Sequence, residues 1–341
     1  MGKFVAGVLV AVLIMVGAFL GYNAWKRAQE GSAGPPAANA PQPPPPPVTL
    51  ASTTRTAADP VTPPPPPPPG VTAAGLMADY TRARDRLERQ AAYEKLAAAF
   101  PASAEAARAR EALAREHREA ADAWHLRNVL SDMLWRGLSE TRETEIKREL
   151  VDLNKDLIFS PRKSPDGEIY TIRPGDAVEK IARHYKITGG FVGRINRLKD
   201  VAKIRFGDTL KVVNGPFDVL VEVGKYRLTV LLRGRFVKEY RIGVGKDEST
   251  PLGRFTVKDK LVNPTWYGPD GEVKSADDPQ NPLGERWIGI TGGRGYGIHG
   301  TIEPESIGTA CSRGCIRMLE KDIDEVYDFV VPELSRVTMV E

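Results

Sequence analysis

The chain has 341 residues, of which 41% are hydrophobic, so it is long enough for two or three domains with ordinary cores. Its 48 basic and 44 acidic side chains give a net charge of +4 and are mixed along the sequence. Because no block of basic residues could follow a phosphate backbone, this composition argues against a nucleic-acid partner.

The first predicted element is an apolar, uncharged segment from Phe4 to Tyr22. As a helix it would span roughly 28 Å, close to the roughly 30 Å hydrocarbon core of a bilayer. A cleaved signal peptide is the alternative, but its apolar region usually has only about 7 to 15 residues. We therefore expect residues 1–30 to form an uncleaved transmembrane anchor. Basic residues flank both ends of the segment, so charge does not set its orientation.

Residues 31–72 are rich in Pro and Ala and contain almost no large apolar side chain. Such a segment cannot bury a core, and its proline runs favour extended polyproline II structure at about 3.1 Å per residue. It is predicted to be a stiff linker that reaches on the order of 100 Å. A ligand for SH3-type domains is the alternative.

Residues 73–160 are predicted to form a helical hairpin module. Apolar residues repeat at helical spacing, as in the set Leu76, Tyr80, Ala83 and Leu87. The stretch Tyr93–Ala114 resembles part of a tetratricopeptide-like hairpin, although no second copy occurs at the period of about 34 residues. The module could bind a protein partner, or it could be a spacer or a dimerising hairpin.

The pattern changes at residues 168–214, where a short alternating strand leads through Pro-Gly-Asp into an amphipathic helix. Asp176 is predicted to cap that helix, with Glu179 three residues later as in a capping box. A second helix at Phe191–Leu198 and a closing strand complete a βααβ unit.

This unit resembles a LysM domain. The matching residues are Tyr170, Gly175, Asp176, Ile181, Ala182, Tyr185, Asn196, Gly207, Asp208 and Leu210. The resemblance implies that the unit binds glycans containing N-acetylglucosamine, such as peptidoglycan, with Gly175, Asp176 and Asn196 as candidate glycan-binding residues. The alternative is that these residues only form the turns and core of the unit.

Residues 216–341 are predicted to form a mainly-β domain. From Phe217 apolar and polar residues alternate between turns at Gly224-Lys225 and Arg233-Gly234, which predicts an antiparallel meander. Loops rich in Gly, Pro and aromatic residues follow, and such loops commonly carry the functional site of a β scaffold.

Both cysteines of the chain, Cys311 and Cys315, follow His299 within sixteen residues. A structural zinc site needs four ligands, and this group supplies at most three. A permanent disulfide would require the short loop between the cysteines to bend back on itself. A nucleophile with its base remains, because Cys315 follows a Gly that lets the backbone approach a substrate carbonyl.

The arrangement closely resembles the L,D-transpeptidase catalytic domain of the YkuD type. Its signature is a His-Gly dipeptide, and later Ser/Thr-His-Gly-Cys followed by an apolar residue and Arg. Here the dipeptide is His299-Gly300, and the second part of the signature is residues 312–317. Segments that look like other parts of the family occur in family order at residues 250–255, 263–267, 281–284 and 295–298.

The resemblance implies that Cys315 is the nucleophile and that His299 is its base, with the thiol activated as a thiolate by a neighbouring imidazolium. It implies backbone N–H groups of Gly314 and Cys315 as the oxyanion hole. The implied substrate-binding residues are Arg313, Ser312, Gly300, Tyr296, Trp287 and Arg317, and Trp287 and Arg317 are alternatively core and scaffold residues. No metal or other cofactor is expected.

One position departs from the family pattern, because Arg313 replaces the His that often precedes Gly-Cys. Arginine stays protonated and cannot act as a base. A cation there could lower the pKa of the thiol or hold a substrate carboxylate. Cys311 is expected to be a small buried residue, or alternatively a thiol that traps the nucleophile as a reversible disulfide.

The function implied is a peptidoglycan L,D-transpeptidase that forms 3-3 cross-links through a thioacyl-enzyme on Cys315. Alternatives on the same site are an L,D-carboxypeptidase and a wall-to-protein transferase. An inactive wall-binding anchor is a further alternative. The expected partners are peptidoglycan stem peptides at the catalytic domain, glycan at the LysM unit, and the cytoplasmic membrane at the anchor. The domains after the anchor are expected on the periplasmic or cell-wall side.

Overall fold

The computed structural model describes residue 68 and residues 70–268, 271–293 and 295–341. The predicted anchor and nearly all of the predicted linker lie outside these residues. In the described part, no helix has the length and apolar character needed to cross a membrane. The described residues within Thr53–Trp266 and Lys274–Glu341 form one compact unit, and the segment Tyr267–Val273 belongs to a separate one.

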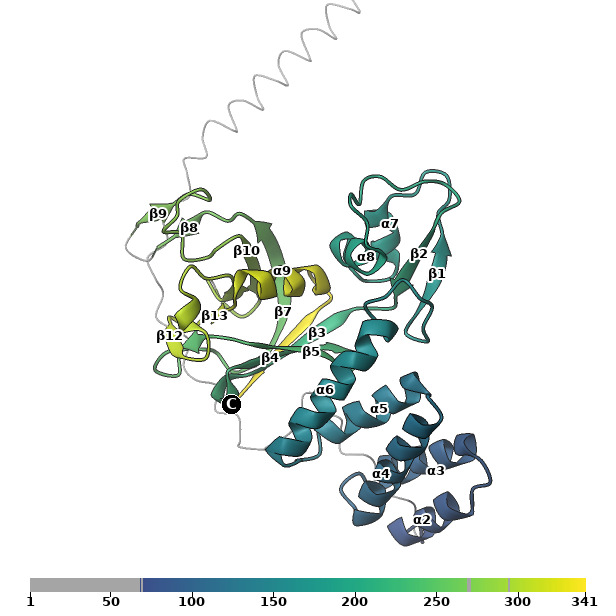
Figure 1. Cartoon of the computed structure of the whole chain (residues 1–341). Coiled ribbons are helices and arrows are strands. Elements are labelled where there is room, and N and C mark those ends of the chain that lie inside the picture. The colour runs from purple at the N-terminus through teal and green to yellow at the C-terminus, as the bar shows by residue number, and fades with distance from the viewer. Residues whose placement is uncertain (1–67, 69, 269–270, 294) are drawn as a thin grey trace, which may run out of the picture. The chain divides into compact units, whose positions relative to one another are not determined.

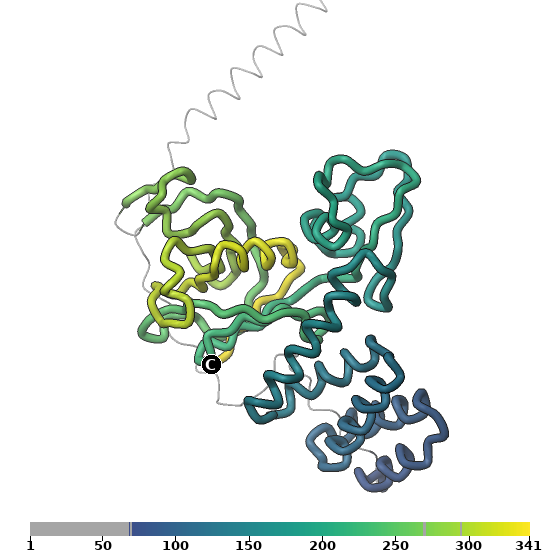
Figure 2. The backbone as a smooth tube through the Cα atoms, viewed as in Figure 1, coloured from purple at the N-terminus to yellow at the C-terminus, as the bar shows by residue number. Residues whose placement is uncertain are grey.

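The helical module contains five helices in its described part, where the sequence predicted a hairpin. They are α2 (Ala73–Arg82), α3 (Arg86–Ala99), α4 (Ala104–Glu119), α5 (Ala123–Leu134) and α6 (Glu140–Leu157). Consecutive helices pack side by side around buried Leu and Ile residues (Figures 1 and 2). The prediction gave too few helices. The turns between the helices are short, so the helical spacing of apolar residues continues across them and hides the boundaries.

Each of these five helices begins at a side chain that caps it. The oxygen of the capping residue accepts the backbone N–H of the residue three positions later, at Thr72, Asp85, Ser103, Asp122 and Ser139. Such caps satisfy one of the N–H groups that a helix start leaves without a partner. The helix boundaries are therefore encoded locally, by single residues.

The predicted βααβ unit is confirmed. Its elements are β1 (Gly167–Thr171), α7 (Val178–His184), α8 (Gly189–Asn196) and β2 (Thr209–Val213), and the two strands pair antiparallel. The predicted cap is wrong, because α7 begins after Ala177 without a side-chain cap. Asp176 Oδ2 instead accepts the Arg173 N–H and the Tyr170 hydroxyl, each at 2.8 Å, and so closes the turn before the helix.

The C-terminal domain is built on an eight-stranded sheet with the order β13-β11-β10-β7-β14-β3-β4-β5 (Figure 1). The strands are β3 (Phe217–Glu222), β4 (Arg227–Leu232), β5 (Arg235–Arg241), β7 (Gly253–Val262), β10 (Arg286–Ile290), β11 (Gly297–His299), β13 (Ile316–Arg317) and β14 (Arg336–Val340). The predicted antiparallel meander is confirmed for β3 to β5. The rest of the sheet is mixed, because β14 runs parallel to β3 and β13 parallel to β11.

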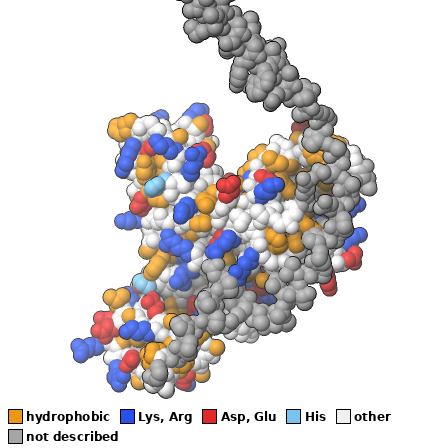
Figure 3. Space-filling model, turned by 180° about the vertical axis from the view of Figure 1, so that it is seen from behind, with side chains coloured by type: hydrophobic (Ala, Val, Ile, Leu, Met, Phe, Trp, Pro, Cys, Tyr) orange, Lys and Arg blue, Asp and Glu red, His pale blue; other side chains and the backbone are white. Residues whose placement is uncertain are grey.

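Shorter elements connect these strands. They are the 3₁₀ turns η1 (Val223–Lys225) and η2 (Pro304–Ser306), the helix α9 (Glu320–Phe329), and the strands β6 (Val244–Gly245), β8 (Trp266–Tyr267), β9 (Val273–Lys274) and β12 (Ala310–Ser312). Helix α9 packs near β10 with three buried apolar side chains, Ile323, Val326 and Phe329. The surface in Figure 3 carries charged side chains of both signs, interrupted by apolar ones.

The pairing of β11 with β13 brings two distant parts of the sequence together. Ile298 lies opposite Ile316 and His299 opposite Arg317, in parallel register. Ile298 and Ile316 are fully buried, so this edge of the sheet is held by the core. Cys315 directly precedes β13, so the same register places it beside Gly297 of β11, two residues before His299.

Candidate active site

His299 is buried at the end of β11, with 4% of its surface exposed. Its Nδ1 lies 2.6 Å from the carbonyl oxygen of Gly300. A carbonyl oxygen only accepts hydrogen bonds, so Nδ1 carries the proton and donates it. The other nitrogen, Nε2, therefore keeps a lone pair, which is the form of imidazole that can act as a base.

The indole ring of Trp287 holds the imidazole from one side. The two rings are nearly parallel, with an interplanar angle of 21° and centroids 5.9 Å apart. The register pairs Trp287 of β10 with His299 of β11, and the indole Nε1 donates to Asp259 Oδ1 at 3.2 Å. The structure therefore gives Trp287 a positioning role, which matches the scaffold alternative from the sequence.

The Cys315 thiol is directed at backbone groups of the neighbouring loop. Its Sγ donates to the carbonyl oxygen of Gly295 at 3.2 Å. Burial raises the pKa of Cys315, and this outweighs the lowering effects of the Gly297 backbone N–H and of Arg317. The thiol is therefore protonated at rest.

The predicted imidazolium-stabilised thiolate is wrong for the resting site. The pKa of His299 is lowered to about 4, chiefly by burial; the Gly300 hydrogen bond raises it by less, and the positive charge of Arg317 makes the smallest contribution, a lowering one. The physical cause is the same for both groups, since a charged form is disfavoured where water is excluded. Near neutral pH the pair is a neutral thiol and a neutral imidazole.

Ser312 braces the loop that carries the nucleophile. Its buried hydroxyl donates to the Cys315 carbonyl oxygen at 2.6 Å and accepts the Gly314 N–H at 3.0 Å. The Ser312 hydroxyl thus bonds within the loop, and its role in substrate binding stays a prediction. For the same reason the Gly314 N–H, predicted for the oxyanion hole, already has a partner in this conformation.

Gly314 of the motif is required by its backbone conformation and by a backbone neighbour, whereas the neighbour of Gly300 is the end of a side chain that can move. Gly314 has a φ of +125°, and a Cβ there would lie 2.7 Å from both the Ser249 carbonyl oxygen and the Tyr296 ring. A Cβ at Gly300 would lie 2.1 Å from a carboxylate oxygen of Glu320. Gly300 and Tyr296 thus shape the backbone around His299 and Cys315.

The two arginines of the motif differ in their surroundings. Arg317 is largely buried, and its Nη1 lies 2.5 Å from Glu303 Oε2 and 3.9 Å from Cys311 Sγ. Arg313 is exposed. Arg317, and not Arg313, is therefore the cation that lowers the pKa of Cys315.

Cys311 is half-buried, and its thiol contacts the Ser306 carbonyl oxygen at 3.7 Å. Both cysteines are free thiols. Among the described residues, the group of Cys311, Cys315 and His299 does not form a cluster with metal-ligand spacing.

Sequence reasoning missed three residues that shape this site, namely Asp259, Glu303 and Glu320. Asp259 fixes Trp287, Glu303 pairs with Arg317, and Glu320 lies under Gly300. Each is separated by fourteen residues or more from the residue that it contacts. No local motif marks an acid that acts at such a separation.

The candidate glycan-binding residues of the LysM unit have separate roles. Gly175 adopts a positive φ of 79° in the exposed turn that Asp176 closes. Asn196 joins α8 to β2, because its side chain accepts the Lys211 N–H at 2.7 Å and donates to the carbonyl oxygens of Val192 and Lys211. Asn196 therefore holds the fold together.

Comparison with known proteins agrees with these observations. Residues 216–339 match the L,D-transpeptidase catalytic domain of the YkuD family, and residues 170–213 match the LysM domain. The chain is 33% identical over 178 residues to the putative L,D-transpeptidase YkuD of Bacillus subtilis, which covers 50% of this chain and 97% of that protein.

Two further relatives have the same description. The putative L,D-transpeptidase YqjB of Bacillus subtilis is 38% identical over 128 residues, which covers 36% of this chain and 70% of that protein. A solved L,D-transpeptidase from Mycobacterium smegmatis is 19% identical with a TM-score of 0.32, over 40% of this chain and 64% of that one. On the near-complete match to YkuD and the geometry around Cys315, the chain belongs to the L,D-transpeptidase family of acyltransferases and carries a LysM domain ahead of its catalytic domain.

Proposed function

We propose that this L,D-transpeptidase forms 3-3 cross-links in peptidoglycan, with Cys315 as nucleophile and His299 as base. The observation that carries the proposal is the hydrogen bond from His299 Nδ1 to the Gly300 carbonyl oxygen, which leaves Nε2 as a proton acceptor. The register of β11 and β13 supports it, since it places Cys315 on the strand next to His299, two residues away along the sheet.

The first half-reaction is acylation of Cys315. Sγ attacks the carbonyl carbon of the third residue of a stem tetrapeptide, a diamino acid, while Nε2 of His299 takes the thiol proton. The amide bond to the terminal D-alanine breaks, and His299 returns the proton to the leaving amine. Because both groups are neutral at rest, proton transfer has to accompany the attack.

The second half-reaction restores the enzyme. The side-chain amine of a second stem attacks the thioester, His299 removes a proton from that amine, and the thiol leaves with a proton. The negative charge on the substrate oxygen in both halves requires hydrogen-bond donors. We assign the Cys315 backbone N–H to this role, and one such donor is worth about 3 kcal/mol in comparable enzymes.

The remaining binding partners follow from the domain order. The LysM unit would hold peptidoglycan glycan near the turn of Gly175 and Asp176, and Arg313 would meet a substrate carboxylate from its exposed position. Residues 1–30 would anchor the chain in the cytoplasmic membrane, and residues 31–72 would tether the other domains on the periplasmic or cell-wall side. A protein partner of the helical module is a further proposal.

The test is intact-protein mass after incubation of the full-length chain, in detergent, with a disaccharide tetrapeptide and separately with a carbapenem. The expected result is an adduct on the wild type that Cys315→Ala lacks, together with a cross-linked dimer. Release of tripeptide alone would favour an L,D-carboxypeptidase, and an adduct that only a protein amine resolves would favour a wall-to-protein transferase. A folded, reduced protein that forms no adduct with either compound would be an inactive wall-binding anchor.

A further inference from the structure

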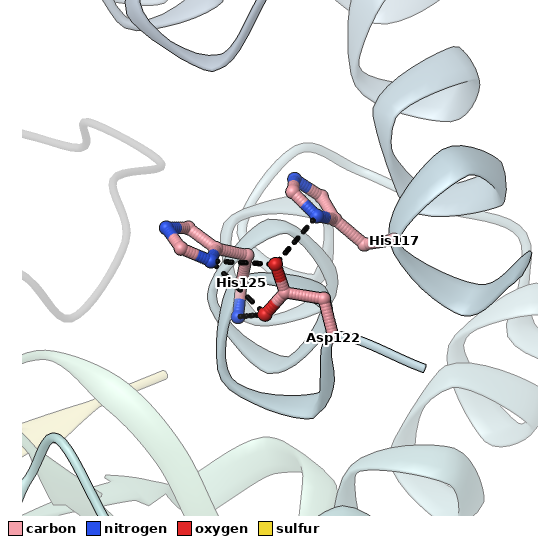
Figure 4. Close-up of side chains that lie close together, drawn as sticks. All are labelled: His117, Asp122 and His125. Carbon is pink, nitrogen blue, oxygen red and sulfur yellow. Dashed lines mark hydrogen bonds and ion pairs between the residues drawn. The ribbon is translucent and has the colours of Figure 1, made fainter. Parts of the chain in front are cut away.

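A cluster of two histidines and one aspartate lies in the helical module, away from the residues of the catalytic motif. His117 is near the end of α4, Asp122 is the residue before α5, and His125 is in the first turn of α5 (Figure 4). Both imidazole rings lie beside the Asp122 carboxylate in this view. The chain has four histidines, so half of them meet at this turn.

The contact with Gln90 shows which ring nitrogen of His117 carries the proton. His117 is 1% exposed, and its Nε2 lies 3.2 Å from Gln90 Oε1. The Gln90 amide nitrogen donates to Glu94 at 2.8 Å, so Oε1 is the end of the amide that faces His117. An amide oxygen only accepts, and therefore Nε2 of His117 carries the proton.

The other ring nitrogen of His117, Nδ1, therefore has a lone pair that points towards a carboxylate. Nδ1 has no hydrogen-bond partner, although it is buried, and it lies 3.4 Å from Asp122 Oδ2. A lone pair and a carboxylate oxygen repel each other at this distance unless a cation lies between them.

His125 completes the cluster from the other side. Its Nδ1 lies 3.0 Å from both oxygens of Asp122, and its ring is nearly parallel to that of His117, with centroids 5.1 Å apart. The side chain of His125 is 30% exposed, so its ring can turn.

We propose that His117, Asp122 and His125 bind a divalent transition-metal ion, Zn²⁺, through one nitrogen of each imidazole and one carboxylate oxygen. Ligand atoms around tetrahedral zinc lie about 3.3 Å apart, since the bonds are about 2.0 to 2.1 Å long. The contacts of Asp122 Oδ2 to the two Nδ1 atoms are 3.4 Å and 3.0 Å, and all three ligand atoms lie within 4.8 Å of one another. Three protein ligands would leave the fourth tetrahedral position for water.

The electrostatic surroundings include one group that opposes a cation. Arg86 Nη2 lies 3.5 Å from Asp122 Oδ2, and the Arg86 side chain is 40% exposed. It competes with the ion for the carboxylate but can move into solvent when the ion binds. Removing this charge is therefore expected to strengthen metal binding.

A purely structural role for the cluster gives a different expectation. Asp122 caps α5, because its side chain accepts the His125 backbone N–H at 3.4 Å. Asparagine caps a helix as well as aspartate does. Asp122→Asn therefore keeps the cap and removes the negative charge, which separates the two roles.

The experiment titrates Zn²⁺ alone and Co²⁺ alone into the untagged full-length chain in detergent, with calorimetry for Zn²⁺ and visible absorption for Co²⁺. The expected result is one equivalent of bound metal. Asp122→Asn and His125→Gln are each expected to weaken binding by at least about tenfold, which is the lower end of losses from changes around metal sites. Asp122→Asn should leave the melting temperature of the metal-free protein nearly unchanged, and Arg86→Ala should tighten binding.

Two control variants locate the metal. His184→Gln changes an exposed histidine outside the cluster, and Cys315→Ala removes the catalytic thiol, so both should bind Zn²⁺ as the wild type does. The proposal is overturned if the wild type binds neither ion, if binding survives both Asp122→Asn and His125→Gln, or if it is lost in Cys315→Ala. Because His117 is buried and its replacement could unfold the module, the test relies on Asp122 and His125.

Discussion

The catalytic domain and the helical module each contain a buried histidine, and they use it differently. In the catalytic domain, Nδ1 of His299 donates to the Gly300 carbonyl oxygen, and Nε2 keeps the lone pair. In the helical module, Nε2 of His117 donates to Gln90, and the lone pair of Nδ1 faces Asp122. In the first arrangement the free nitrogen is available as the proposed base for the thiol. In the second, the free nitrogen lies beside a carboxylate and is available as the proposed metal ligand.

The difference teaches that the partner of one ring nitrogen decides the chemistry of the other. Burial lowers the pKa of both residues, so both are neutral imidazoles near pH 7. A carbonyl partner and an amide-oxygen partner differ little in strength. What differs is the group that faces the free lone pair.

The largest expected effect is that of His299→Gln, which removes the base. General acid–base catalysis contributes about 10²- to 10⁴-fold, so the rate of thioester formation should fall by that factor. The measurement is the rate of Cys315 acylation by a carbapenem, followed by intact-protein mass. The matched control is His184→Gln, which should be acylated at the wild-type rate. Equal acylation rates in the two variants would show that His299 is not the base.

Gly314→Ala is expected to have the next largest effect. Its Cβ would meet the Ser249 carbonyl oxygen and the Tyr296 ring at 2.7 Å, at a φ of +125°. Strained backbone of this kind costs about 1 to 3 kcal/mol, so acylation should slow by about 5- to 160-fold as the Cys315 loop shifts. Circular dichroism should show a folded protein, and an unchanged rate would mean that the loop does not need this conformation.

Arg313→Ala should have a smaller effect, on substrate binding alone. An exposed cation contributes about 0.2 to 1 kcal/mol to an ion pair, so KM for the tetrapeptide should rise by up to about fivefold. The value of kcat should stay close to that of the wild type, because Arg317 is the cation that acts on Cys315. Steady-state kinetics would measure both constants. A large fall in kcat would contradict this prediction and would mean that Arg313 takes part in the chemical step.

The smallest expected effect is that of lowering the pH from 7 to 5. Because the pKa of His299 is lowered to about 4, the free enzyme should lose less than about twofold of its acylation rate over this range. A histidine with the ordinary pKa of about 6.5 would lose roughly 25-fold. A pH profile of kcat/KM with an acid limb near 6.5 would contradict the neutral, buried pair.

The same shift of the His299 pKa predicts how stability depends on pH. The unfolded chain binds a proton near pH 6.5, whereas the folded chain binds it near pH 4. The free energy of unfolding should therefore fall as the pH drops from about 6.5 towards 4. His299→Gln should make this part of the pH dependence weaker in thermal denaturation.

Much of the site could be predicted because the motif is nearly continuous in the sequence. His299-Gly300 and the segment 312–317 carry the resemblance from which Cys315 is predicted as the nucleophile and His299 as its base. The roles of Ser312, Gly314 and Trp287 could not be read in this way. Their hydrogen bonds and ring contacts depend on which side of the backbone each group faces after the loop has folded.

The sequence by itself determined the order of the helical, LysM and catalytic regions and singled out Cys315 and His299 as candidate site residues, because these depend on short-range patterns. Only the tertiary structure decided the protonation of the two histidine sites. The partner of His117 is 27 residues away, and the thiol of Cys315 contacts a carbonyl 20 residues away. Burial and such distant partners set the pKa and the direction of a lone pair, and neither is encoded in the residues next to it.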